Sequence, residues 1–182
     1  MERLGTLYKL HQIFSMGYLP SRKDETYYMF NPKMRMMYGG MVNCFEHACF
    51  NLTNKLLYEY NFDDLDMINF GERMAYDAMY SKERILKNAI KFVNATGLIM
   101  KEASPKIILK SNEWLVSAYL TKSSTINDFH FFLQEREGYW SGKCGYELET
   151  ETFDTLPKIY TAPHDVEYQY EATFKIQNPF VK

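Results

Sequence analysis

Apolar residues recur at helical spacing through most of the first half of the chain, each time along one face of a predicted helix. The last of these helices has the strongest boundaries, because Ser81 can cap its start and Gly97 can end it. Between the first two helices, prolines and glycines occur amid tyrosine and methionine without a helical period, which predicts an irregular segment. The predicted helices span residues 4–16, 44–58, about 65–80, and 82–95.

The second half changes to short segments of β-branched and aromatic residues separated by turn signals, a pattern typical of strands. Residues 114–121 are apolar on both alternating sets of positions, as expected for a central strand that is covered on both faces. Residues 135–138 predict a hairpin turn. Helices followed by strands predict an α+β fold, with N-terminal helices packed on a mainly antiparallel sheet. The predicted strands span residues 98–101, 107–110, 114–121, 128–134, 139–143, 150–154 and 166–176.

Composition narrows the class of protein. With 182 residues, of which 46% are hydrophobic, the chain can bury the core of one domain. A net charge of −2 argues against nucleic acid as the main partner, because phosphate binding needs concentrated positive charge. No apolar run is long enough to span a membrane. The N-terminus has no secretory signal, so we expect synthesis in the cytoplasm.

Cys44 lies where a predicted helix begins. A thiol there is close to free backbone N–H groups and to the positive end of the helix dipole, and both favour the nucleophilic thiolate. The same N–H groups, together with the side-chain amide of Asn43, can bind an oxyanion beside the sulfur. The alternative is a structural cysteine buried at a helix start.

His130 is the candidate general base for that thiol. It alternates with Phe129 and Phe131 in a predicted strand, so its imidazole projects from the opposite face of the sheet. A strand holds a ring rigidly, as a base requires. The alternative is a core histidine that is surrounded by aromatic residues.

His47 lies three residues after Cys44, so both side chains share one face of the predicted helix. His47 can pair with the thiol or join it on a metal. Because no second pair of ligands follows at metal spacing, we expect no metal, and no cofactor is indicated. With Cys49 and Cys144, the chain has three cysteines and no Cys-x-x-Cys, which predicts reduced thiols rather than a disulfide framework.

Four segments resemble a group of small bacterial and phage proteins among the papain-like and NlpC/P60-like cysteine hydrolases. They are Asn43-Cys44 with the helix after it, residues 113–119, the sequence Asp-Phe-His-Phe-Phe-Leu-Gln at 128–134, and Gly-Tyr-Trp-Ser-Gly-Lys at 138–143. The likeness covers about residues 40–155. It implies a papain-like / NlpC/P60-like fold in which Cys44 attacks an amide or peptide carbonyl and His130 accepts and returns the proton.

The chain departs from the pattern of that group at Gly142 and Cys144, where the group has His and Pro. A third polar residue about a dozen positions after the base orients it in NlpC/P60-like enzymes, and Gly142 has no side chain to do so. Asp154, Glu147 and Ser141 are the candidates to replace it. Trp140 either walls the substrate groove or packs in the sheet.

Two functions follow from these features. The first is a cysteine hydrolase for an amide or peptide bond, with peptidoglycan as a candidate substrate. The second is a non-catalytic structural or interaction protein on the same fold, such as a phage virion component, which the glycine at 142 and the excess of tyrosine and methionine favour.

The domain organisation separates residues 1–38 from a hydrolase-like domain at 39–182, because the resemblance begins near Gly39. Residues 18–38 carry many aromatic and methionine side chains without a helical period. An isolated segment of this composition exposes a large apolar patch, so we expect it to contact other chains in an oligomer or a virion.

Overall fold

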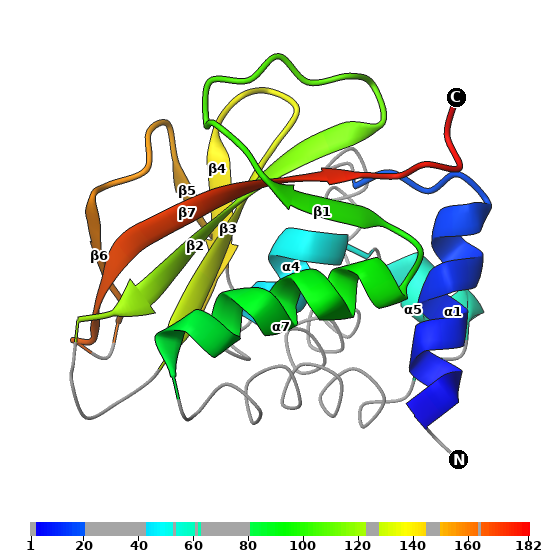
Figure 1. Ribbon diagram of the computed structural model, residues 1–182, viewed down its shortest axis with the longest axis horizontal. Helices are drawn as coiled ribbons and strands as arrows, with labels where there is room; N and C mark the ends of the chain where they lie inside the picture. Colours follow the sequence, from blue (N-terminus) through cyan, green and yellow to red (C-terminus); the bar gives the residue numbers. More distant parts are fainter. Residues whose placement is uncertain are drawn as a thin grey trace.

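The computed structural model describes residues 3–20, 43–52, 54–60, 62, 81–122, 128–144, 150–163 and 165–182. Figure 1 shows helices gathered beside a curved antiparallel sheet, so the predicted α+β class is confirmed. The predicted helix at 65–80 and most of the 18–38 segment lie outside the described residues. No helix in the described ranges is long and apolar enough to cross a membrane.

Helix α7 (Lys82–Ala95) begins and ends where its sequence predicts. The Ser81 hydroxyl accepts the backbone N–H of Arg84, which satisfies one of the open donors of the first turn. Gly97 follows the helix with a φ of +92°, a left-handed conformation that glycine adopts readily. The chain then enters strand β1 (Ile99–Glu102) directly.

The predicted helix 44–58 is divided into α4 (Cys44–Phe50) and α5 (Asn54–Glu59). Asn51 ends α4 in the left-handed region, with a φ of 39°, and its N–H bonds to the carbonyls of Glu46 and His47. Asparagine tolerates this conformation better than most residues, which allows the helix to end at Asn51. The apolar pattern of the sequence continues beyond this point, and for that reason it predicted one longer helix.

Within the described ranges the sheet has seven strands, and all of their pairings are antiparallel. The strand order is β1-β7-β2-β3-β4-β5, with β6 beside β7. The central strand is fully buried, as predicted, and the meander predicted over residues 114–143 is confirmed. The remaining bounds are β2 (Glu113–Thr121), β3 (Phe129–Gln134), β4 (Trp140–Lys143), β5 (Thr150–Phe153), β6 (Ile159–Thr161) and β7 (Glu167–Gln177).

Two strand assignments differ from the sequence prediction. Residues 107–110 form a loop, because both edges of the following strand β2 are already occupied by β3 and β7. Strand β6 was not predicted, since its three residues are too short to show alternation. It pairs with β7 across a turn in which Asp165 has a φ of 60°.

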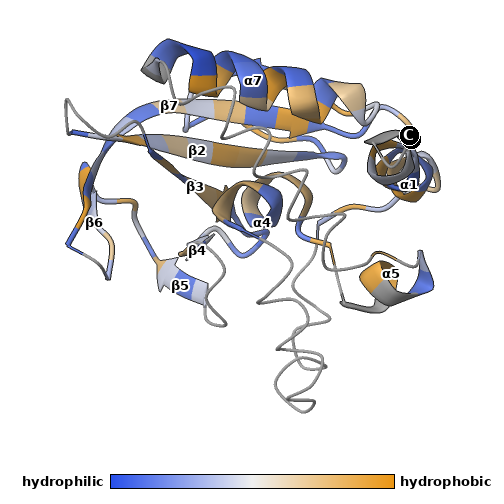
Figure 2. Cartoon of the chain, turned by 90° about the horizontal axis from the view of Figure 1, so that it is seen from below, coloured by the Kyte–Doolittle hydropathy of each residue, from blue (hydrophilic) through white to orange (hydrophobic). Residues whose placement is uncertain are grey.

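The two faces of the sheet bury different cores. The helical face, covered by α1 (Arg3–Ser15), α4, α5 and α7, buries a mainly aliphatic and phenylalanine core (Figure 2). The opposite face, here called the aromatic face, buries Leu115, Tyr119, Phe132, Trp140, Tyr160, Ala162 and Tyr168. The ring centroids of Phe153 in β5 and Tyr160 in β6 are 6.1 Å apart. These two strands are therefore close in space, although β5 ends one side of the sheet and β6 pairs with β7 on the other side. The sheet therefore curls around the aromatic core.

Helix α1 packs against the core of the same domain. Leu10, Ile13 and Phe14 are at most 1% exposed, and the ring of Phe14 stacks on Trp114 with the centroids 6.5 Å apart. The side-chain amide of Asn178 donates to the carbonyl of Phe14 at 2.9 Å. The first and last parts of the chain are thus joined.

Candidate functional site

Asn43 caps helix α4. Its Oδ1 accepts the N–H groups of Phe45 at 2.9 Å and Glu46 at 3.2 Å, while Glu46 Oε2 accepts the N–H of Asn43 at 2.7 Å. This capping box binds three backbone N–H groups at the helix start, those of Asn43, Phe45 and Glu46. The Oδ1 of Asn43 is therefore engaged in the cap, and the oxyanion role expected for its side-chain amide stays a prediction.

Cys44 is the first residue of α4, as predicted, but its thiol is buried, with 5% exposure. The Sγ donates to the carbonyl of Phe129 at 3.9 Å. Burial is the largest influence and, with the negative charges of Asp128 and Glu46, raises the pKa of the thiol to about 12. The thiol is therefore protonated at neutral pH, although a helix start was expected to favour the thiolate.

His130 lies in β3 with its side chain on the aromatic face. Its ring centroid is 4.6 Å from that of Phe132, 4.7 Å from Tyr160 and 5.9 Å from Tyr168. The ring is 2% exposed, and its Nε2 is buried without a hydrogen bond. Burial lowers the pKa of His130 to about 3, so the imidazole is neutral over the usual range.

Cys44 and His130 form no hydrogen bond with each other: the Sγ of Cys44 bonds the carbonyl of Phe129, and the Nε2 of His130 has no partner. The ring of Phe131, next in sequence to His130, packs on Phe45 of α4 with the centroids 5.5 Å apart. Neighbouring residues of a strand point to opposite faces, so Phe131 lies on the helical face with Cys44 while His130 lies on the aromatic face. Helix α4 therefore covers the face of the sheet opposite to the His130 ring.

Gly142 faces the same side of the sheet as His130. A Cβ at this position would stand 2.5 Å from Cε1 of Phe132 and 3.0 Å from Nε2 of His130. The position where the hydrolase group has histidine therefore has no room for a side chain, because the Phe132 ring covers it.

Of the candidates to replace that third residue, the two that the structure describes, Asp154 and Ser141, form no hydrogen bond with His130. Asp154 is exposed just after β5, and Ser141 points to the helical face, where it bonds other side chains. Glu147 lies outside the described residues. Trp140 is 7% exposed and packs in the aromatic core, in agreement with the packing alternative rather than with a groove wall.

A buried polar link between α4 and β4 was missed by the sequence analysis. The Nε2 of His47 lies 3.2 Å from the Oγ of Ser141, which donates to the Oε1 of Glu135 at 2.5 Å. All three residues are at most 5% exposed. Ser141 alternates with Trp140 and Gly142, a signal that could have placed it on the same face as α4.

This link differs from a catalytic triad in its order. The hydroxyl of Ser141 donates its hydrogen bond to the carboxylate of Glu135 rather than to His47. Ser141 is 0% exposed, so its hydroxyl is not accessible to a substrate. His47 is directed to Ser141 rather than sharing a ligand with Cys44. Among the residues described, no group of three His, Cys, Asp or Glu side chains is placed to hold a metal ion.

Comparison with known proteins assigns no family. The chain matches no protein-family model, and none of the curated proteins is similar to it in sequence. The resemblance to papain-like and NlpC/P60-like hydrolases thus rests on the motifs of this sequence alone.

Proposed function

We propose that the chain is a non-catalytic interaction protein that keeps the helix-and-sheet body of the papain-like / NlpC/P60-like cysteine hydrolases without their working cysteine–histidine pair. The observation that carries the proposal is the burial of Cys44 and His130 without a hydrogen bond between them: the Sγ of Cys44 bonds the carbonyl of Phe129, and the Nε2 of His130 is buried without a partner. A general base must lie within hydrogen-bond reach of the proton that it abstracts.

The order of the elements supports the hydrolase-like body. Asn43 caps α4 and Cys44 begins it, and the helix packs on the β3–β4 hairpin, which carries the third and fourth segments of the resemblance. Helix first and antiparallel meander second is the order that the resemblance implies. Because folds are reused for many functions, this likeness alone does not assign an activity.

The acidities of the two groups favour the neutral pair. A thiolate–imidazolium pair needs a proton to move from a thiol with a pKa of about 12 to an imidazole with a pKa of about 3. Burial of both groups therefore favours the neutral thiol and imidazole over the ion pair. Hydrolysis by Cys44 and His130 would need a rearrangement that exposes both side chains and brings them within hydrogen-bond reach.

Thiol labelling tests the proposal. In the folded chain at pH 7.5, iodoacetamide should modify the half-buried Cys144 before Cys44 and Cys49, which are both buried. In guanidinium chloride the three thiols should react at similar rates, which controls for local sequence. The His130→Ala variant, checked for folding by circular dichroism, should label Cys44 no more slowly than the parent does.

The opposite result would support the hydrolase. Cys44 would react first in the folded chain near neutral pH, and His130→Ala would slow that reaction. Release of an amine from a peptidoglycan fragment or a peptide, abolished by Cys44→Ala, would then identify the bond that is cleaved.

The partner contact expected through residues 18–38 belongs to the same proposal, as does assembly into a virion. Of this segment, the structure describes residues 18–20. Tyr18 packs beside Phe14, and its hydroxyl donates to the carbonyl of Asn51 at 2.5 Å. Sedimentation of the chain with and without residues 21–38 tests whether the rest of the segment holds copies together.

A further inference from the structure

We propose that a groove beside the β3–β4 hairpin binds a linear acidic segment of a partner protein, with one large apolar side chain in the groove and carboxylates at its rim. The inference rests on the proposed function, since an interaction protein requires a partner surface. The groove has a volume of about 390 Å³, within the range of small-ligand sites and sufficient for one or two side chains.

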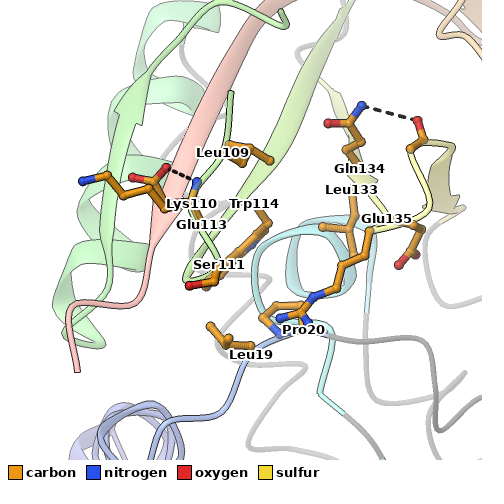
Figure 3. A pocket seen from close by; sticks show the side chains of 12 residues that line it. Leu19, Pro20, Leu109, Lys110, Ser111, Glu113, Trp114, Leu133, Gln134 and Glu135 are labelled. Carbon is orange, nitrogen blue, oxygen red and sulfur yellow. Dashed lines mark hydrogen bonds between the residues drawn. The ribbon is translucent and has the colours of Figure 1, made fainter. Parts of the chain in front are cut away.

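Three parts of the chain form the groove: residues 19–20, residues 109–114 and the hairpin end at 133–138 (Figure 3). It lies at the end of β3 remote from Cys44, which contacts Phe129. At about 3.3 Å per residue, Phe129 and Leu133 are about 13 Å apart along the strand. The groove is therefore distinct from the candidate cysteine site.

The lining offers an apolar surface with one unused hydrogen-bond donor. Leu19, Leu109, Trp114 and Leu133 contribute the apolar part. The Nε1 of Trp114 is buried and forms no hydrogen bond. Buried donors are nearly always paired, and this one is covered, so a ligand could bond it only by moving the atoms over it.

The charges of the lining favour an acidic ligand. Its two acids are buried and engaged: Glu113 accepts from Lys175 at 2.7 Å, and Glu135 accepts from Ser141. Its two cations, Lys110 and Arg136, are exposed, and neither forms an ion pair within the described part of the chain. The exposed charges that the lining presents to a ligand are therefore positive.

The loop between β1 and β2 extends this surface beyond the groove. Ile108 is 93% exposed and Ile107 is 39% exposed, immediately before the groove residues Leu109 and Lys110. Lys106 adds a further exposed cation on the same loop. Exposed apolar side chains beside cations are typical of a contact surface for a segment that alternates apolar and acidic residues.

Selection from a random peptide library displayed on phage, with the full chain immobilised, tests the ligand class. We expect the enriched peptides to carry a large apolar residue flanked by Asp or Glu. A synthetic copy of the most enriched peptide should bind less tightly as salt is raised from about 50 to 500 mM, since exposed ion pairs are screened.

Spectroscopy on the same complex tests the place of binding. The chain has two tryptophans, so an amide correlation spectrum of the ¹⁵N-labelled protein has two indole signals, which Trp140→Phe assigns. The peptide should move the signal of Trp114 and leave that of Trp140 in place. Trp140 is the internal control, because it is buried in the aromatic core.

Charge reversal supplies matched variants. Lys110→Glu with Arg136→Glu should weaken peptide binding at least about tenfold, because two rim attractions become repulsions. Lys91→Glu with Lys158→Glu makes the same change in net charge at exposed positions away from the groove and should alter affinity less than twofold. The correlation spectra of both variants verify their folds.

The inference is overturned by any of four results: no enrichment, enriched peptides without acidic residues, equal weakening by both double variants, or a shift of the Trp140 signal alone. Self-association lost in Lys110→Glu/Arg136→Glu would instead assign the groove to a second copy of the chain, which also overturns it. None of these results changes the labelling order of the cysteines, so the proposed function is tested separately.

Discussion

Gly142→Ala probes how tightly the aromatic face is packed. Gly142 lies directly opposite Phe132 in the β3–β4 register. A Cβ at 142 would stand 2.5 Å from Cε1 and 2.6 Å from Cδ1 of Phe132. Carbon atoms in contact prefer about 3.5–4.0 Å, so the Phe132 ring has to move by about 1 Å.

The Phe132 ring has little freedom to make that movement. It is 0% exposed, with ring centroids 5.1 Å from Tyr160, 5.2 Å from Tyr119 and 5.6 Å from Phe153. Overpacking of a filled core costs about 1–3 kcal/mol. Replacing glycine in the unfolded chain returns about 0.4–1 kcal/mol. The net loss in the free energy of unfolding should be about 1–2 kcal/mol.

Urea unfolding followed by circular dichroism measures this loss. Gly5→Ala is the control, because nothing lies within 4 Å of the added Cβ in helix α1, and it should raise the stability by up to about 1 kcal/mol. Phe132→Leu with Gly142→Ala completes a double-mutant cycle in which removing the ring should recover part of the loss. A Gly142→Ala variant as stable as the parent, or strict additivity in the cycle, would refute the close approach. By the same reasoning Gly142→His, the residue of the hydrolase group, should destabilise the fold further.

Three further predictions follow from the buried polar groups. Burial lowers the pKa of His130 to about 3 in the folded chain, against about 6.5 in the unfolded chain, so the unfolded chain takes up the proton first as the pH is lowered. The free energy of unfolding should therefore decrease as the pH is lowered from 6.5 to about 3, by up to about 1.4 kcal/mol per pH unit. The unfolding midpoints at pH 7 and pH 5 should differ less in His130→Phe than in the parent, and an equal difference would contradict the pKa shift. Asn43→Ala should lower the free energy of unfolding by about 1 kcal/mol through loss of the α4 cap, whereas Asn43→Asp should retain most of it, as thermal melts of both variants would test. Ser141→Ala should lower the free energy of unfolding in urea by about 1.5–3 kcal/mol, because the Ser141 hydroxyl bonds a carboxylate. Ser117→Ala should lower it less, because the Ser117 hydroxyl bonds the neutral Thr173. The reverse order of the two losses would refute the charged hydrogen bond.

Local signals in the sequence were sufficient for several elements. The cap at Ser81 and the stop at Gly97 delimit α7, since these residues act on the backbone within one turn. The turn at residues 135–138 closes the predicted hairpin, with Gly138 at a φ of +96°. The alternation in strand 128–134 also placed His130 opposite to Phe129 and Phe131. Each of these follows from interactions between residues close in the chain.

The tertiary structure decided what alternation leaves open, namely which face of the sheet the helix covers. Alternation separates His130 from Phe131, but only the packing of Phe45 on Phe131 shows that α4 covers the face opposite to the His130 ring. The loop at 107–110 has strand-like residues, but both edges of the adjoining strand β2 are occupied by β7 and β3, which depends on the arrangement of the whole sheet. Likewise, position 142 has no room for a Cβ because the Phe132 ring of the neighbouring strand covers it. These outcomes depend on contacts between distant segments, whose energies no local pattern contains.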